Sequence, residues 1–268
     1  MAEREGNPGA GPWRRALGRL RAGARPGADG GSGAAARGDG SGAQLLADLV
    51  AANRILAEQG IVDGYGHVSV RCAHDPSRFL LSRALAPELV TAGDVLEHDL
   101  DGAALEPQGR PLYSERFLHA EIYRARPDVH SVVHDHSPGA VLFGVLDAPL
   151  RALHHMSAFL GKGLPVWDAR HDAAGALLVS DPAAGRSLAE TLADRPAVLL
   201  RGHGAVIVGR SLPEAVGRAV YLERGAQLQA QAMATGQPIT WLDETETDFD
   251  PGAYSRAWKA WKRGVRRV

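Results

Sequence analysis

Two histidines separated by one residue, His134 and His136, have the types and spacing that could hold a metal ion. They lie at the end of the apolar stretch 131–135, which is predicted to be a buried strand. Residues i and i+2 of a strand point to the same face, so the two imidazoles should project together. Neutral imidazole nitrogens are common ligands of divalent metals. The pair alone would also fit two ordinary hydrogen-bonded histidines.

A third histidine, His203, lies between Gly202 and Gly204 in a predicted turn between two apolar strands. Flanking glycines permit positive φ and let the backbone approach a ligand closely, although a plain turn histidine would have the same neighbours. With His134 and His136, it predicts a three-histidine site with an open position. Such a site is typical of a catalytic metal, because structural sites are normally closed.

Glu115 is the first residue of a helix predicted over 115–126, which leads into the strand that carries His134. A carboxylate at a helix N-terminus is electrostatically favoured, so a capping role is one interpretation. The functional interpretation is proton transfer beside the metal, or a fourth ligand to the resting ion. His119 lies one turn later on the same helix face and is predicted to pack near the site or support it.

Helices and short strands alternate along the rest of the chain, which predicts an α/β layered domain around one sheet. Helices are predicted from Ala43 to Gly60, over 115–126 and 182–193, from a Ser211 cap to about Thr235, and around Tyr254, Trp258 and Trp261. Strands are predicted over 68–71, 79–82, 95–99, 131–135, 197–200 and 205–208.

Composition limits the class of protein. The formal net charge of −1 argues against nucleic acid as a partner, and no apolar run is long enough to span a bilayer. The single cysteine, Cys72, excludes an intramolecular disulfide and favours a cytoplasmic location. Only three lysines occur, two of them in a basic C-terminal segment, which disfavours a Schiff-base enzyme.

Residues 1–40 contain eleven glycines and few large aliphatic side chains, so we predict a disordered Gly/Ala/Arg-rich tail. Within it, Trp13, Leu17 and Leu20 could form a short basic amphipathic helix, although a solvated tail is the simpler interpretation. The catalytic domain is then predicted to span residues 41–268.

Several stretches resemble the class II aldolase/adducin family: residues 66–69, 114–129, 132–138 and 202–205. The resemblance covers about residues 43–245. It implies a three-layer α/β/α sandwich around a mostly antiparallel sheet, and a homotetramer with sites at subunit interfaces. It also implies one divalent cation per subunit, held by His134, His136 and His203, with Glu115 as acid/base.

The departures from the family's sugar-phosphate aldolases are informative. Those enzymes have an asparagine at the position of His67, a Thr-Pro-Ser-Gly stretch where this chain has 82–85, and a serine where it has Tyr113. Small donors of that kind form a phosphate cradle, so their replacement argues against a phosphorylated substrate. Residues 81–91, 109–117 and 149–161 instead resemble the decarboxylase branch, similar to 3,4-dihydroxyphthalate decarboxylase and 2-hydroxy-3-carboxymuconic semialdehyde decarboxylase. The predicted substrate-binding residues are His67, Ser82, Arg83, Tyr113 and His155.

The leading hypothesis is non-oxidative decarboxylation of a hydroxylated aromatic or enol carboxylic acid, a small-molecule substrate, through an enolate stabilised by the metal. Zinc is the expected metal, with manganese, iron and cobalt as alternatives. Three other functions remain open: retro-aldol cleavage of an unphosphorylated substrate, Fe(II)-dependent oxygenation of an aryl-pyruvate-type acid, and a metal-free adducin-like scaffold. The presence of all three histidines disfavours the scaffold.

Overall fold

The computed structural model describes residues 40–171, 175–243, 245–246 and 251–265. The predicted disordered tail and its amphipathic stretch lie outside these residues, apart from Gly40, which begins a helix. The chain divides into two units, Met1–Asp48 and Leu49–Val268. In the first unit, the described residues form the first half of that helix.

A seven-stranded sheet forms the centre of the second unit, in the order β3-β2-β1-β4-β7-β6-β5. Every neighbouring pair of strands is antiparallel except β5 and β6, which confirms the prediction of a mostly antiparallel sheet. The strands are β1 (His67–Arg71), β2 (Arg78–Ser82), β3 (Val95–Asp99), β4 (Ser131–Asp135), β5 (Val166–Trp167), β6 (Ala197–Leu200) and β7 (Gly204–Gly209).

Six α-helices accompany the sheet in the described part of the chain: α2 (Gly40–Glu58), α3 (Arg116–Ala125), α4 (Pro138–Val145), α5 (Pro182–Leu192), α6 (Leu212–Ala234) and α7 (Tyr254–Val265). Short 3-10 turns occur at Pro87–Leu89, Ala92–Asp94, His155–Leu160, Ala169–His171 and Pro251–Ala253. The predicted Ser211 cap is confirmed, because its hydroxyl accepts the backbone N–H of Glu214. The helix α4 and the strand β5 were not predicted from the sequence.

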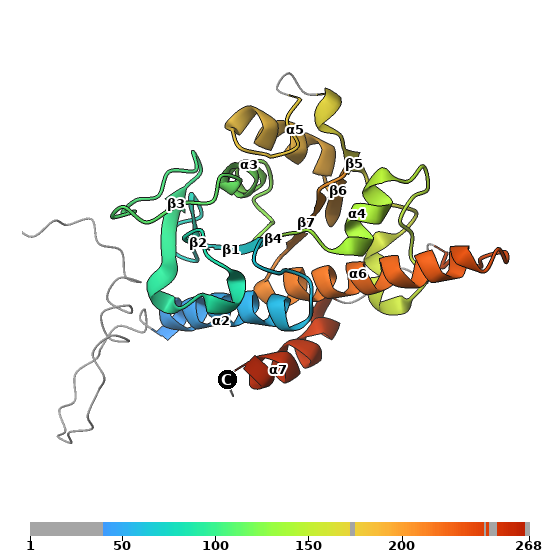
Figure 1. Cartoon of the computed structure of the whole chain (residues 1–268). Helices are drawn as coiled ribbons and strands as arrows, with labels where there is room; N and C mark the ends of the chain where they lie inside the picture. Colours follow the sequence, from blue (N-terminus) through green and yellow to red (C-terminus); the bar gives the residue numbers. More distant parts are fainter. Residues whose placement is uncertain (1–39, 172–174, 244, 247–250, 266–268) are drawn as a thin grey trace, which may run out of the picture. The chain divides into compact units, whose positions relative to one another are not determined.

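Both faces of the sheet are covered by helices. Successive side chains of a buried strand point to opposite faces, so apolar side chains on each face need such cover. On one face, α3 and α5 pack together over the sheet through a continuous apolar cluster that includes Phe79, Leu118, Leu188 and Val206. The long helix α6 lies on the other face (Figure 1). This arrangement confirms the three-layer sandwich.

The strand β4 lies at the middle of the sheet, between β1 and β7, and all five of its residues are buried. Its register pairs His134 with His67 of β1 on one side, and Asp135 with Ala205 of β7 on the other. The end of β4 therefore meets the β6–β7 turn that carries His203. Among the helices that the structure describes, none combines the length and apolarity needed to cross a membrane.

Candidate metal centre

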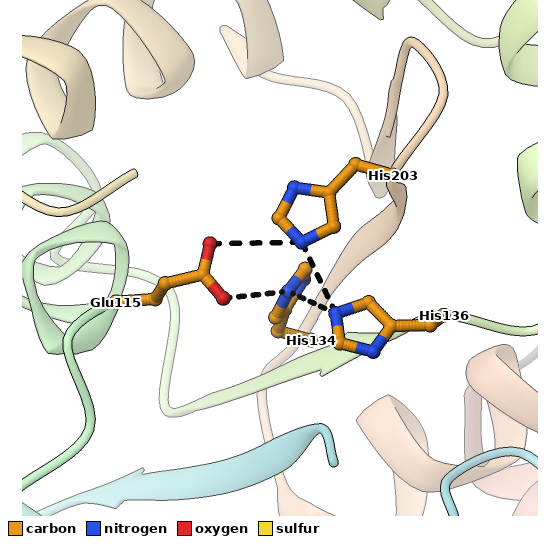
Figure 2. Close-up of side chains that lie close together, drawn as sticks. All are labelled: Glu115, His134, His136 and His203. Carbon is orange, nitrogen blue, oxygen red and sulfur yellow. Dashed lines mark hydrogen bonds and ion pairs between the residues drawn. The ribbon is translucent and has the colours of Figure 1, made fainter. Parts of the chain in front are cut away.

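Three imidazole nitrogens converge where β4 ends. Nε2 of His136 lies 3.1 Å from Nε2 of His134 and 3.1 Å from Nε2 of His203. His134 is the fourth residue of β4 and His136 follows the strand, so the i, i+2 spacing brings both rings to one place, as the sequence predicted. His203 reaches them from the turn between β6 and β7, where Gly202 adopts a φ of +67° (Figure 2).

The hydrogen bonds on the far side of two rings fix which nitrogen carries the proton. Nδ1 of His134 lies 3.0 Å from the carbonyl oxygen of Ala205, and Nδ1 of His203 lies 2.9 Å from that of Leu177. A carbonyl can only accept, so each Nδ1 must be the N–H donor. In a neutral ring each Nε2 then presents an unprotonated lone pair to its neighbours. Burial alone would lower the pKa of His134, but the Glu115 carboxylate raises it, so this ring loses its Nε2 proton when a cation takes that position. Converging lone pairs with backbone-anchored rings are the arrangement of metal-binding histidines, so these residues fit a divalent cation.

Glu115 completes a cluster whose ligand atoms all lie within 4.8 Å of one another. It occupies the N-cap position of α3, yet its side chain caps nothing, so the capping interpretation is wrong. Its carboxylate oxygens instead lie 3.4 Å from Nε2 of His134 and 3.7 Å from Nε2 of His203. The backbone N–H of Val179 donates to the same carboxylate at 3.2 Å, which orients it toward the histidines.

The electrostatics agree with this geometry. Burial alone would raise the pKa of Glu115, but the hydrogen bond to His134 and the neighbouring imidazoles hold that pKa well below its usual range. Burial and the neighbouring His134 and His203 lower the pKa of His136 to about 4. The cluster therefore presents an ionised carboxylate beside a neutral His136, and neutral imidazole is the form that binds a metal.

One of the five predicted substrate residues, His67, contacts the cluster, and a second, Tyr113, contacts His67. The ring of His67 lies 5.1 Å from that of His134, as expected for paired residues of β1 and β4, and 4.5 Å from that of Tyr113. The Tyr113 hydroxyl donates to the carbonyl oxygen of Leu85 at 2.6 Å, which anchors the ring against the loop after β2. Ser82, the last residue of β2, is buried.

The remaining two, Arg83 and His155, make no contact with the cluster among the described residues. Nε of Arg83 is ion-paired to Asp94 at 2.7 Å, so that nitrogen is already used, and a carboxylate clamp would depend on the two terminal nitrogens. His155 is exposed on a 3-10 turn, where its ring packs against His154. No contact between His155 and the metal cluster is seen in the described part of this single chain.

Two buried hydroxyls close to the site were not predicted from the sequence. Ser69 of β1 and Tyr123 of α3 form a hydrogen-bonded chain with His119 that ends at His67. The signal for Ser69 was its place two residues after His67, on the same strand face. Tyr123 lies one turn after His119, but helical spacing gave no sign that its hydroxyl meets a strand more than 50 residues away.

The comparison with protein families identifies the class. The family model for the "Class II Aldolase and Adducin N-terminal domain" matches residues 47–230, well over half of the chain. The chain therefore belongs to the class II aldolase and adducin family.

Two relatives that are more than 30% identical over most of their length are decarboxylases. The chain is 34% identical over 239 residues to decarboxylase tropJ of Talaromyces stipitatus, covering 79% of this chain and 90% of that protein. It is 33% identical over 245 residues to 3,4-dihydroxyphthalate decarboxylase of a Terrabacter species, covering 84% and 96%. The structure of L-fuculose 1-phosphate aldolase from Glaciozyma antarctica matches with a TM-score of 0.72 at 24% identity, covering 89% of this chain and 94% of that one. That last likeness supports the fold alone.

Proposed function

We propose that this protein is a metal-dependent carboxy-lyase that removes CO₂ from a hydroxylated aromatic or enol carboxylic acid. The observation that carries the proposal is the position of Glu115, whose carboxylate faces three converging imidazole nitrogens at 3.4 Å and 3.7 Å from two of them. A site of this composition combines a cation position with a group that can move a proton. The names of the relatives, two decarboxylases of similar length, favour loss of CO₂ as the reaction.

In the proposed reaction, Glu115 removes the proton of the substrate hydroxyl and returns it to the ring carbon that bears the carboxylate. A carbonyl then lies β to the carboxylate. The bond from the ring carbon to the carboxyl carbon breaks and CO₂ leaves. The electron pair of the broken bond stays with the ring, and the negative charge ends on the former carbonyl oxygen as an enolate or phenolate. A divalent cation held by His134, His136 and His203 supplies Lewis-acid stabilisation of that negative charge when bound.

Zinc is the metal we propose, because three imidazoles with an open position are typical of catalytic zinc, while manganese, iron and cobalt could occupy the same nitrogens. The proposed substrate-binding residues are His67, Ser82, Arg83, Tyr113 and His155. The ring of His67 lies against that of His134 in the cluster, and the ring of Tyr113 lies against that of His67. His155 would take part only if another subunit or a different conformation brought it there.

We also propose the architecture that surrounds this site. The catalytic domain would begin at Gly40, the first residue of α2, one residue before the predicted start at residue 41. The protein would be cytoplasmic and assemble as a homotetramer, as the family resemblance implies. The exposed apolar side chains of Leu142, Val145 and Leu146, at and just after the end of α4, are consistent with a subunit contact.

The test is an assay of metal-reconstituted protein with a panel of ortho-hydroxy aromatic acids, following CO₂ and O₂. We expect CO₂ release without oxygen uptake. The matched variant Glu115→Gln keeps the size of the side chain but cannot transfer a proton at neutral pH, so kcat should fall about 10²–10⁴-fold while bound metal stays the same. A variant with near wild-type kcat would show that another group moves the proton.

The competing reactions give different results in the same assay. Retro-aldol cleavage would need the same metal and proton-transfer group, so an aldolase would cleave fuculose 1-phosphate or an unphosphorylated analogue and release no CO₂ from the acids. An Fe(II) oxygenase would consume oxygen in proportion to product. Either outcome would overturn the carboxy-lyase proposal.

A further inference from the structure

A buried chain of hydrogen bonds runs from α3 to the edge of the metal cluster. The hydroxyl of Tyr123 lies 2.8 Å from Oγ of Ser69, and the same Oγ lies 2.7 Å from Nδ1 of His119. Nε2 of His119 then lies 2.7 Å from Nδ1 of His67. All four side chains are at most 3% exposed. The chain therefore has one closed end, at Tyr123, and one end that faces the cluster, at His67.

The protons of these four side chains can be ordered in three ways while the histidines are neutral. Four groups each carry one polar hydrogen, and three hydrogen bonds each use one, so one hydrogen remains unused. In the first order, Tyr123 donates to Ser69, Ser69 to His119, and His119 to Nδ1 of His67, which leaves an N–H at Nε2 of His67. In the second order every bond is reversed, and the phenol hydrogen of Tyr123 is left over. In the third order Ser69 accepts from both Tyr123 and His119, His119 accepts from Nδ1 of His67, and the hydroxyl hydrogen of Ser69 is left over.

The two buried hydroxyls decide among the three orders. No acceptor for the Tyr123 hydroxyl other than Ser69 is found among the described residues, and none for the Ser69 hydroxyl other than Tyr123 and His119. The backbone N–H of Val132 also faces the phenol oxygen, but it is a donor and cannot take the phenol hydrogen. A buried donor left without a partner costs on the order of 1–3 kcal/mol. The first order avoids this cost. Nε2 of His67 makes no hydrogen bond with the described residues, so its hydrogen can be donated to whatever occupies the site.

We infer that Tyr123, Ser69 and His119 act as positioning residues that fix His67 as a neutral imidazole with its N–H at Nε2, directed to the substrate as a hydrogen-bond donor. This inference rests on the proposed function for the identity of the substrate. An N–H at this position selects for an oxygen that carries no proton of its own. A carboxylate or phenolate oxygen beside the metal centre fits that requirement, and a neutral hydroxyl fits less well because its own hydrogen would also need an acceptor.

The same chain does not serve as a proton source. If His67 gave its Nε2 proton to the substrate, the bonds would shift one by one and leave a phenolate on Tyr123. Burial raises the pKa of Tyr123, so a buried phenolate is strongly disfavoured. His67 therefore keeps its proton through the reaction and recognises the substrate, while proton transfer falls to Glu115.

The first arm of the test reads the proton position directly and needs no substrate. The full-length zinc-loaded protein, labelled with ¹⁵N at histidine, is measured by long-range ¹H–¹⁵N NMR correlation, with the His67 signals assigned by their loss in His67→Gln. We expect the proton of His67 on Nε2. A proton on Nδ1, or on both nitrogens, would overturn the inference whether or not the protein proves to be a decarboxylase.

Two variants distinguish the role of Nδ1 of His67, which bonds to His119, from the role of Nε2, which faces the substrate in this proposal. His67→Asn places an oxygen near the position of Nδ1 and can still accept from His119, but it offers nothing at the position of Nε2. His67→Gln places an amide N–H near Nε2. In the CO₂ assay with a dihydroxyphthalate-type acid, we expect KM to rise about 10- to 100-fold for Asn and much less for Gln, since a hydrogen bond to a charged group is lost only in the first. Equal losses in both variants would contradict substrate recognition by Nε2.

The positioning role is tested at His119. His119→Gln can still donate an amide N–H to Nδ1 of His67, whereas His119→Leu fills a similar volume without a donor. We expect the Gln variant to keep the His67 tautomer and KM, and the Leu variant to show both tautomers with a raised KM. Circular dichroism and zinc content serve as folding controls. A His67 tautomer that is unchanged in the Leu variant would show that the buried chain does not set it.

Discussion

The imidazoles of the candidate metal centre show how a single hydrogen bond prepares a side chain for its task. His134 and His203 each use Nδ1 to donate to a backbone carbonyl, at 3.0 Å and 2.9 Å, and this leaves both Nε2 lone pairs facing one point. Backbone carbonyls hold their places without the conformational freedom of a side chain. The rings are therefore oriented before any cation binds, which reduces the entropic cost of binding.

Removal of one ligand should therefore remove the metal without unfolding the protein. We expect wild-type protein to bind one divalent cation per chain, and His134→Ala, His136→Ala and His203→Ala each to lose most of it, as measured by elemental analysis after dialysis. Far-UV circular dichroism should stay unchanged. His171→Ala is the matched control, because this histidine is exposed on a 3-10 turn away from the three ligands, and its loss should leave the metal content as it was. An active wild-type preparation without stoichiometric metal would contradict the proposal.

His98 provides a separate test of residue electrostatics, away from the cluster. It is buried on β3 against the ring of Phe79, and Nδ1 has no hydrogen-bond partner among the described residues. Burial lowers its pKa to about 4, below the ordinary value of 6.5. Between these two pH values the unfolded chain binds a proton at His98 and the folded chain does not, so stability must fall as the pH falls through this window.

The expected loss at His98 has an upper bound of roughly 3 kcal/mol between pH 7 and pH 4. Urea unfolding of the wild type and of His98→Leu at matched pH values measures it. The variant should show a shallower decrease in the free energy of unfolding, because it has no group to protonate at that position. Parallel pH curves for the two proteins would mean that His98 is protonated in the folded state, contrary to its burial.

At the scale of elements, the turn between β6 and β7 brings His203 to the end of β4. Gly204, the first residue of β7, adopts a φ of +157° and packs directly on the backbone of β4. A Cβ at this position would overlap the carbonyl oxygen of Asp135 and lie 3.0 Å from Cα of His136. Glycine is therefore required for the two strands to approach closely enough for the histidines to meet.

Gly204→Ala should accordingly damage both the fold and the site. We expect the free energy of unfolding to fall by roughly 1–3 kcal/mol, as for other overpacked substitutions, and the affinity for the metal to fall with it. Gly64→Ala is the control, since a Cβ there meets nothing within 4 Å and the change should stay within about 0.5 kcal/mol. Wild-type stability and metal affinity in Gly204→Ala would show that β4 and the turn can separate without consequence.

Local patterns predicted the elements where the patterns were strong. The strand over 131–135 has the predicted bounds, and the helix over 182–193 ends one residue earlier, at Leu192. The helix α4 was not predicted because its eight residues are apolar or glycine and show no polar face. Pro138 was interpreted only as the stop after the preceding strand, whereas it is also the first residue of the helix. The two-residue strand β5 is too short for any periodic signal.

At the scale of the whole second unit, the order of the strands in the sheet brings the three histidines together. Local sequence patterns do not predict that order. The i, i+2 spacing predicted that His134 and His136 would meet, but the approach of His203 depends on β7 pairing with β4 across more than 60 residues. The family resemblance supplied this part of the prediction. Of the buried chain from Tyr123 to His67, the sequence predicted only that His119 supports the site; the links to Ser69 and Tyr123 need the packing of α3 over β1 as well as the strand register.

The last prediction concerns assembly and the segment before α2. The exposed apolar side chains of Leu142, Val145 and Leu146 favour a contact between subunits, while the glycine-rich composition of residues 1–39 supplies few side chains for one. Light scattering at micromolar concentration should therefore give the mass of a tetramer, both for the full chain and for a variant that begins at Gly40 and so keeps α2 whole. Metal content and the rate of CO₂ release should be equal in the two proteins. A fully active monomer would contradict the proposed tetramer, and a truncated protein that dissociates would show that the first 39 residues hold the subunits together.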